Sequence, residues 1–213
     1  VLYYDFENVR QKIYQRTMTR LSRIEGDKLV ESSFSKDEKL RFEKAHSQFK
    51  KMLNHFRVVN DRALSPEIMS RHIDFIRHET RQNFCVVVID SLHKLPFKDF
   101  SERRTGIDAW LRQFESIRDE YHVSFLIISE LTRGDKGAYD ETPHMGIFKG
   151  SGDIEYSADN ALVLYPETDA QKITSVKDRS ANLWLVASRE HSPGLVASYQ
   201  LEYPYWSFRE AEH

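Results

Sequence analysis

The stretch Phe84-Cys85-Val86-Val87-Val88-Ile89-Asp90 decides the fold, because this unbroken apolar run ends abruptly in an acidic residue. Its length and β-branched residues predict a strand that is covered on both faces, as strands of parallel sheets are. An aspartate at the end of such a strand is well placed to serve a nucleotide site, but a purely structural turn residue gives the same pattern. The rest of the chain decides between these interpretations.

Composition indicates an ordinary globular domain. The chain has 213 residues, 40% hydrophobic and 30% charged, with a formal net charge of −2, which is enough to bury a sizeable core. This near-neutral balance argues against binding nucleic acid by bulk charge, so such binding would need local basic groups. The single cysteine, Cys85, excludes an internal disulfide, and we interpret it as a core residue of a protein from a reducing compartment.

Membrane and zinc sites are not expected. The nine histidines show no metal-ligand spacing. No stretch is long and apolar enough to span a membrane, and no signal peptide opens the chain. We therefore expect a cytoplasmic location.

Strands and helices alternate along most of the chain. Predicted strands cover residues 1–6, 56–60, 84–90, 123–128 and 160–165, the last after a short helix. The run at 123–128 is expected to be a buried strand, like the run at 84–90. Two or three amphipathic helices are predicted between Asn8 and His55, one from Ser65-Pro66-Glu67 to about Arg81, and one from Ile107 to Tyr121 after a basic link at 103–106.

These patterns predict one α/β domain over residues 1–213, with a mainly parallel sheet flanked by helices. The C-terminal strands at 183–187, 196–201 and 206–208 indicate hairpin-linked antiparallel pairing. Ligands bind beyond the carboxyl ends of such parallel strands. The polar residues at strand ends are Glu7, Asp90, Ser129 with Glu130, and Arg189.

Five short blocks carry a family resemblance. They are Tyr4-Asp5-Phe6-Glu7, Val88-Ile89-Asp90-Ser91-Leu92, Ile128-Ser129-Glu130-Leu131-Thr132-Arg133, Phe148-Lys149-Gly150-Ser151-Gly152-Asp153-Ile154-Glu155 with Ala158-Asp159, and Ala187-Ser188-Arg189-Glu190-His191-Ser192-Pro193-Gly194. In this order they resemble the RecA-like motor domain, a P-loop NTPase core, of replicative DnaB-type hexameric helicases. The resemblance runs over nearly the whole chain, and the fourth block is the most specific.

The resemblance implies three catalytic residues. Glu7 matches the glutamate that orients and deprotonates the attacking water, and Asp90 matches the Walker B acid that holds Mg²⁺, usually through its water shell. Arg189 matches the arginine that reaches into a neighbouring subunit's site. The alternatives are that Glu7 caps a helix, that Asp90 is structural, and that Arg189 is solvated or pairs locally with Glu190.

Two further blocks imply sensing and DNA contact. Ser129 and Glu130 stand where the family has a Ser-Gln sensor of the terminal phosphate, and a carboxylate there repels phosphate unless a cation such as Arg133 pairs with it. Ala187 stands where relatives often have a second cation. The loop Lys149-Gly150-Ser151-Gly152 matches the segment that grips single-stranded DNA by its phosphates.

One motif is missing from the sequence. No Gly-Lys-Ser or Gly-Lys-Thr occurs in the chain, so it lacks the phosphate-binding P-loop (Walker A) of such motors. Because the chain also begins inside a predicted strand, we expect a longer parent protein, and an isolated chain that neither binds ATP tightly nor hydrolyses it.

The resulting hypothesis is an ATP-dependent DNA helicase that uses ATP and Mg²⁺. The resemblance implies a homo-oligomeric, six-subunit ring around single-stranded DNA, with a loader or primase as a further partner. One alternative is a RecA-superfamily ATPase that is not a helicase. The other is a degenerate, non-hydrolysing binding module, which Glu130 and Ala187 favour.

Overall fold

The computed structural model describes residues 1–96, 103–132, 143–148, 153–166 and 179–211. The chain divides into two compact units. The first comprises Val1–Ile13, Lys50–Thr132 and Phe148–Ser157, and the second comprises Tyr14–Phe49, Arg133–Ile147 and Ala158–His213. The expectation of a single domain over residues 1–213 stays a prediction.

The first unit contains a parallel sheet in the order β2-β1-β3-β4. Its strands are β1 (Leu2–Asp5), β2 (Arg57–Val59), β3 (Val86–Asp90) and β4 (Ser124–Ile128). Asp90 lies opposite Asp5 on one side and Ile128 on the other. The carboxyl ends of β1, β3 and β4 are therefore level with one another.

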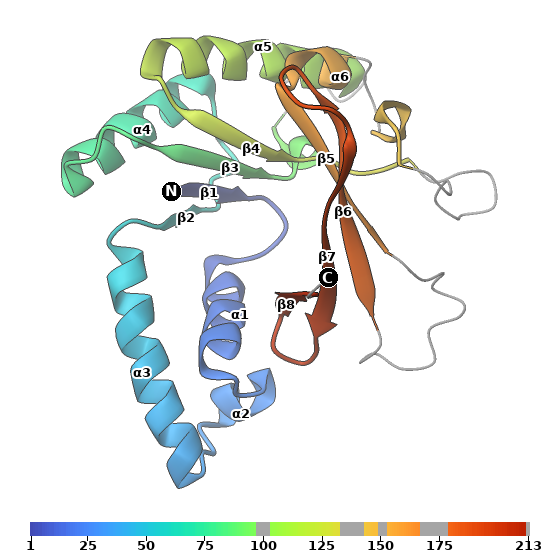
Figure 1. The fold of residues 1–213 in the computed structure, drawn as a ribbon. Coiled ribbons are helices and arrows are strands. Elements are labelled where there is room, and N and C mark those ends of the chain that lie inside the picture. Colours follow the sequence, from blue (N-terminus) through green and yellow to red (C-terminus); the bar gives the residue numbers. More distant parts are fainter. Residues whose placement is uncertain (97–102, 133–142, 149–152, 167–178, 212–213) are drawn as a thin grey trace. The chain divides into compact units, whose positions relative to one another are not determined.

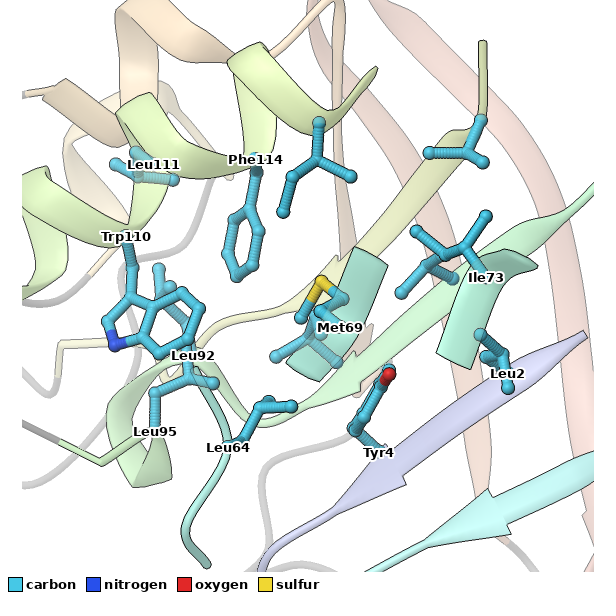
Figure 2. Packing of buried hydrophobic residues seen from close by; sticks show 14 of the residues in the cluster. Leu2, Tyr4, Leu64, Met69, Ile73, Leu92, Leu95, Trp110, Leu111 and Phe114 are labelled. Carbon is cyan, nitrogen blue, oxygen red and sulfur yellow. The ribbon is translucent and has the colours of Figure 1, made fainter. Parts of the chain in front are cut away.

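Two helices, α4 (Pro66–Thr80) and α5 (Arg103–Tyr121), cover one face of this sheet (Figure 1). The helix α4 begins as predicted, with Ser65 accepting a hydrogen bond from the backbone N–H of Ile68. Side chains from both helices and from the sheet form one apolar cluster, in which Trp110 and Phe114 point toward the sheet (Figure 2). Each fully buried large side chain in it contributes about 1.5–3 kcal/mol relative to exposure.

One expectation about β4 is wrong, because side chains on the other face of the sheet are exposed. The run at 123–128 was expected to be buried, but Leu126 is 53% and Ile128 42% exposed. An apolar run shows that both faces of a strand are apolar, but not that a further layer covers the second face. In β3, Val87, Val88 and Ile89 are buried as predicted, but Val86 at the start of the strand is 41% exposed, and Phe84 lies before the strand and is exposed.

Two shorter elements complete the first unit, the 3-10 helix η1 (Leu92–Lys94) directly after β3, and α6 (Asp153–Ser157), which contacts α5. The link expected at residues 103–106 is wrong, because α5 already begins at Arg103. Gly106 lies in the first turn, where backbone N–H groups lack intrahelical acceptors in any case. The buried residues that follow stabilise the helix.

The second unit combines helices with an antiparallel sheet. The helices are α1 (Arg10–Ser22), whose first turn belongs to the first unit, α2 (Gly26–Glu31) and α3 (Lys36–Leu53), which continues into the first unit. The sheet has the order β5-β6-β7-β8. Its strands are β5 (Asn160–Pro166), β6 (Ser180–Ser188), β7 (Gly194–Glu202) and β8 (Ser207–Glu210), with a short 3-10 helix η3 (Met145–Ile147) before them.

These elements confirm the predicted α/β class, a parallel sheet flanked by helices together with antiparallel C-terminal strands. The helices predicted between Asn8 and His55 are three. Among the described residues, no helix has the length and apolarity that a membrane crossing requires.

Candidate functional site

Four of the predicted site residues meet at the carboxyl edge of the parallel sheet. Asp90 is the last residue of β3, and the backbone N–H of Phe6 donates to its carbonyl oxygen at 3.0 Å. Glu7 comes two residues after β1, and Ser129 and Glu130 directly follow β4. The parallel register therefore places these residues along one edge, as the sequence predicted.

Asp90 is held by a residue that the sequence did not single out. The hydroxyl of Tyr3 donates to Asp90 Oδ2 at 2.5 Å. Tyr3 lies opposite Val88, so its side chain and that of Asp90 share one face of the sheet. The next residue, Ser91, is joined to Asp90 by a cis peptide bond. Its buried hydroxyl has no hydrogen-bond partner among the described residues.

Glu7 is exposed and lies three residues before α1 begins at Arg10, so it is not at the N-cap position of that helix. Its carboxylate Oε1 lies 3.4 Å from Lys94 Nζ, in the 3-10 helix that follows Asp90. Both residues line a cavity of about 570 Å³, which is bounded by Phe6, Glu7, Arg62, Lys94, Leu95 and Pro96. Of the described residues, one carboxylate and two cations therefore lie on the cavity wall.

Asp5 shapes the turn that presents Glu7. It is 1% exposed, and its Oδ1 accepts hydrogen bonds from the backbone N–H groups of Glu7 and Asn8 at 2.8 and 2.7 Å. Asn60, just beyond β2, donates from Nδ2 to the carbonyls of Asp5 and Asn8, both at 2.8 Å. The direction of Glu7 is thus set by the buried Asp5 of β1 and by the half-buried Asn60 just after β2.

The polar pair after β4 is connected to the end of β3. The backbone N–H of Glu130 donates to Nδ1 of His93 at 3.3 Å, and His93 is 4% exposed. A buried imidazole in η1 thus holds the backbone that carries Ser129 and Glu130. Arg133, the cation expected beside Glu130, lies outside the described residues.

Arg189 follows β6 in the second unit. Its Nε lies 3.4 Å from Asp159 Oδ1, and its backbone N–H donates to the Asp159 carbonyl at 3.0 Å. Both side chains are more than half exposed, so the pair is weak. The sequence had left open a local ion pair with Glu190, whereas the ion pair seen here joins Arg189 to Asp159. The predicted DNA-binding loop, Lys149-Gly150-Ser151-Gly152, lies outside the described residues.

The edge suits Mg²⁺ and a nucleotide. Asp90 offers a hard oxygen ligand, which Mg²⁺ prefers. Among the described residues, no group of three or more His, Cys, Asp or Glu side chains could hold a metal ion. Bound Mg²⁺ would therefore need phosphate and water oxygens as well, which is its usual arrangement at nucleotide sites. The cavity volume of about 570 Å³ falls in the range of small-molecule sites.

Sequence reasoning assigned no role to Tyr3, Asp5, Lys94, His93 or Arg62. Lys94 and His93 stand within four residues of Asp90, so their nearness was a usable signal. Asp5 belongs to the first block, and an Asp two residues before an exposed turn residue is a recognised turn pattern. The contact of Tyr3 depends on the pairing register of β1 with β3, which the sequence does not show.

Comparisons with known proteins agree with this geometry. The family model for the DnaB-like helicase C terminal domain matches residues 1–205. A probable plasmid replicative DNA helicase of Chlamydia trachomatis is 25% identical over 81% of this chain and 38% of its own length. The corresponding protein of Chlamydia muridarum is 22% identical over 72% of this chain and 33% of its own length. The chain thus spans little more than a third of these relatives.

Solved structures share the fold. A DnaB-like replicative helicase, described with its interactions with primase, superposes with a TM-score of 0.83 at 18% identity, over 99% of this chain and 50% of that one. A second structure, described as an ATPase domain, superposes with a TM-score of 0.85 at 17% identity, over 99% of this chain and 74% of that one. For a KaiC-like protein of Pyrococcus horikoshii the TM-score is only 0.51 at 14% identity, over 99% of this chain and 76% of that one. With its RecA-like fold and a match over nearly its whole length, the chain belongs to the DnaB-like helicase C-terminal domain family.

Proposed function

We propose that this chain is the motor part of an ATP-dependent DNA helicase, which hydrolyses ATP at subunit interfaces and grips single-stranded DNA. One observation carries the proposal: Glu7, Asp90 and the Ser129–Glu130 pair lie along one sheet edge, beside a cavity lined by Glu7, Arg62 and Lys94. Phosphoryl transfer is catalysed mainly by positioning and charge stabilisation. A rigid sheet edge supplies the positioning, and the charged wall supplies the charges.

Glu7 and Asp90 have separate tasks in this proposal. Glu7 orients the attacking water and takes its proton, and the Lys94 ammonium lies 3.4 Å from the Glu7 carboxylate on the same cavity wall. Asp90 would hold Mg²⁺ through water. When bound, Mg²⁺ neutralises charge on the phosphate oxygens. Arg62 and Lys94 add positive charge where phosphates would lie.

The remaining residues act beyond this edge. Arg189 directly follows β6 and its side chain is more than half exposed, and in this proposal it acts on a phosphoryl group bound by a neighbouring subunit. The loop Lys149-Gly150-Ser151-Gly152 grips single-stranded DNA by its phosphates. A role of Arg189 in trans requires an oligomer, and the family resemblance implies that this oligomer is a six-subunit ring. A primase or loader is a further partner, since one structural neighbour is described with primase.

The direct test is ATP hydrolysis by the full-length protein, with and without single-stranded DNA. Glu7→Gln and Asp90→Asn should lower turnover about 100-fold or more, as loss of a positioned catalytic group does. Lys149→Ala should lose the stimulation by DNA but keep the basal rate. Arg209→Ala removes an exposed arginine from β8 of the same sheet as Arg189, and it is the matched control for Arg189→Ala.

The trans role of Arg189 is tested by mixing subunits. Arg189→Ala and Glu7→Gln proteins should each be inactive alone, because every interface lacks one group. In mixed rings some interfaces combine an intact Glu7 with an intact neighbouring Arg189, so mixing should restore part of the turnover. Mixtures that stay silent would show that Arg189 does not act on a neighbour's nucleotide.

A second candidate function is a non-hydrolysing binding module. Glu130 in place of the usual glutamine, Ala187, and the absence of Gly-Lys-Ser or Gly-Lys-Thr from these 213 residues favour it. A full-length protein that binds ATP and DNA but never turns over would support this module and overturn the motor. Hydrolysis that DNA does not stimulate would instead point to a RecA-superfamily ATPase that is not a helicase. Residues 1–213 alone should neither bind ATP tightly nor hydrolyse it.

A further inference from the structure

The hydrogen bond between Tyr3 and Asp90 joins two strands at the candidate metal site. Tyr3 stands in the middle of β1 and lies opposite Val88, two residues before Asp90 in β3. Its hydroxyl therefore reaches diagonally along one face of the sheet to Asp90 Oδ2, at 2.5 Å. The ring of Tyr3 lies against Phe56, with the two ring centroids 6.0 Å apart. The ring position is thus fixed by packing, and the hydroxyl position follows from it.

This contact has the chemistry of a charge-assisted bond. An O–H donor to a carboxylate at 2.5–2.7 Å is shorter and about twice as strong as a neutral pair. A carboxylate whose one oxygen is held in this way no longer rotates about its Cβ–Cγ bond. The direction of its other oxygen is then set before any metal arrives, and this preorganisation lowers the cost of binding.

We propose that Tyr3 is a positioning residue for the metal–nucleotide complex, acting through the Asp90 carboxylate. The inference rests on the proposed function of Asp90 and goes beyond it by assigning the group that orients this acid. Partners that orient metal-binding side chains typically change metal affinity or activity about 10- to 100-fold when they are removed. Because Tyr3 acts on metal binding, its loss should be compensated by more metal.

The test compares Tyr3→Phe with Tyr4→Phe in the full-length protein. Both changes remove one hydroxyl from adjacent residues of β1. The Tyr4 hydroxyl lies on the other face of the strand, 3.1 Å from His72 Nδ1, so Tyr4→Phe is a matched control. One readout is Mn²⁺ binding in the presence of a non-hydrolysable ATP analogue, followed by electron paramagnetic resonance. The other is the Mg²⁺ dependence of ATP hydrolysis.

Tyr3→Phe should raise the half-saturating concentration of both metals about tenfold. Turnover at saturating Mg²⁺ should stay within about twofold of wild type, because a defect in ground-state binding leaves kcat intact. Tyr4→Phe should leave the half-saturating metal concentration unchanged. Phe56→Leu, which loosens the ring of Tyr3 but keeps its hydroxyl, should give a smaller shift of the same sign.

The possible failures are distinguishable. A wild-type protein that binds metal and nucleotide, with a Tyr3→Phe variant that binds them equally well, overturns the inference and leaves the proposed function standing. Equal shifts in Tyr3→Phe and Tyr4→Phe, together with lowered melting temperatures, would show a general loss of packing and also overturn it. A wild-type protein with no metal-dependent nucleotide binding overturns the proposed function and this inference together.

Discussion

Replacement of Asp5 by alanine tests how the turn that carries Glu7 is held. The change removes an acceptor for two backbone N–H groups, those of Glu7 at 2.8 Å and Asn8 at 2.7 Å. Hydrogen bonds to a charged group contribute about 1.5–3 kcal/mol each. Glu7 is exposed and Asn8 half-buried, so water replaces part of this interaction. We therefore expect the turn to lose about 1.5–3 kcal/mol in total, not the sum of two full bonds.

Hydrogen exchange at the amides of Glu7 and Asn8 measures this loss directly. Since 1.4 kcal/mol corresponds to a tenfold change, exchange at these two amides should become about 10- to 150-fold faster in Asp5→Ala. Amides of α4 should be unaffected, and ATP turnover should fall because Glu7 loses its direction. Asp5→Asn retains the Oδ1 acceptor and should keep most of the protection. Unchanged exchange in Asp5→Ala would refute the assignment of Asp5 as the residue that shapes this turn.

Three further predictions concern the first unit. Ile73→Ala, at a fully buried site of α4, should lower the free energy of unfolding by about 2–5 kcal/mol. Phe75→Ala, on the exposed side of α4, is its control. Equal urea midpoints for the two variants would contradict the packing of α4 against the sheet. Burial lowers the pKa of His72 below its usual 6.5, because the folded state disfavours the charged imidazolium. The contribution of the neutral His72 to the free energy of unfolding should therefore be fully present above pH 6.5 and be lost as the pH falls through the folded-state pKa. His72→Gln should flatten this part of a plot of stability against pH. Burial raises the pKa of the Cys85 thiol, so iodoacetamide should label Cys85 only in urea, and rapid labelling of the native protein would contradict this.

The features that the sequence predicted well depend on short-range signals. The apolar run before Asp90 gave a strand at the predicted place, and Ser65-Pro66-Glu67 gave the start of α4. Glu7, Asp90 and Ser129 were expected together because the carboxyl ends of parallel strands share one edge. These inferences need only the type of each element and the order of elements along the chain.

The features that the sequence did not predict depend on pairing and packing. The contact of Tyr3 with Asp90 requires the parallel register of β1 and β3, and the contact of His93 with Glu130 requires η1 to lie beside the end of β4. The exposure of Leu126 depends on which layers cover the sheet. The helical start of α5 shows that burial of later residues outweighs a glycine in the first turn. None of these properties is local in sequence.

The adjacency of β1 and β3 has a consequence for how such a domain tolerates change. The spacing between Glu7 and Asp90 is fixed by the ladder between these two strands and by the bond from the Phe6 N–H to the Asp90 carbonyl. The long segment that connects them, from Asn8 to Cys85, supports β1 through β2, α4 and Asn60, whereas the ladder between β1 and β3 includes no residue of α1, α2 or α3. Insertions or new docking surfaces within α1, α2 or α3 can therefore accumulate without altering the separation of the two acids. The architecture separates the part of the chain that can diverge from the part that must stay constant for the proposed catalysis.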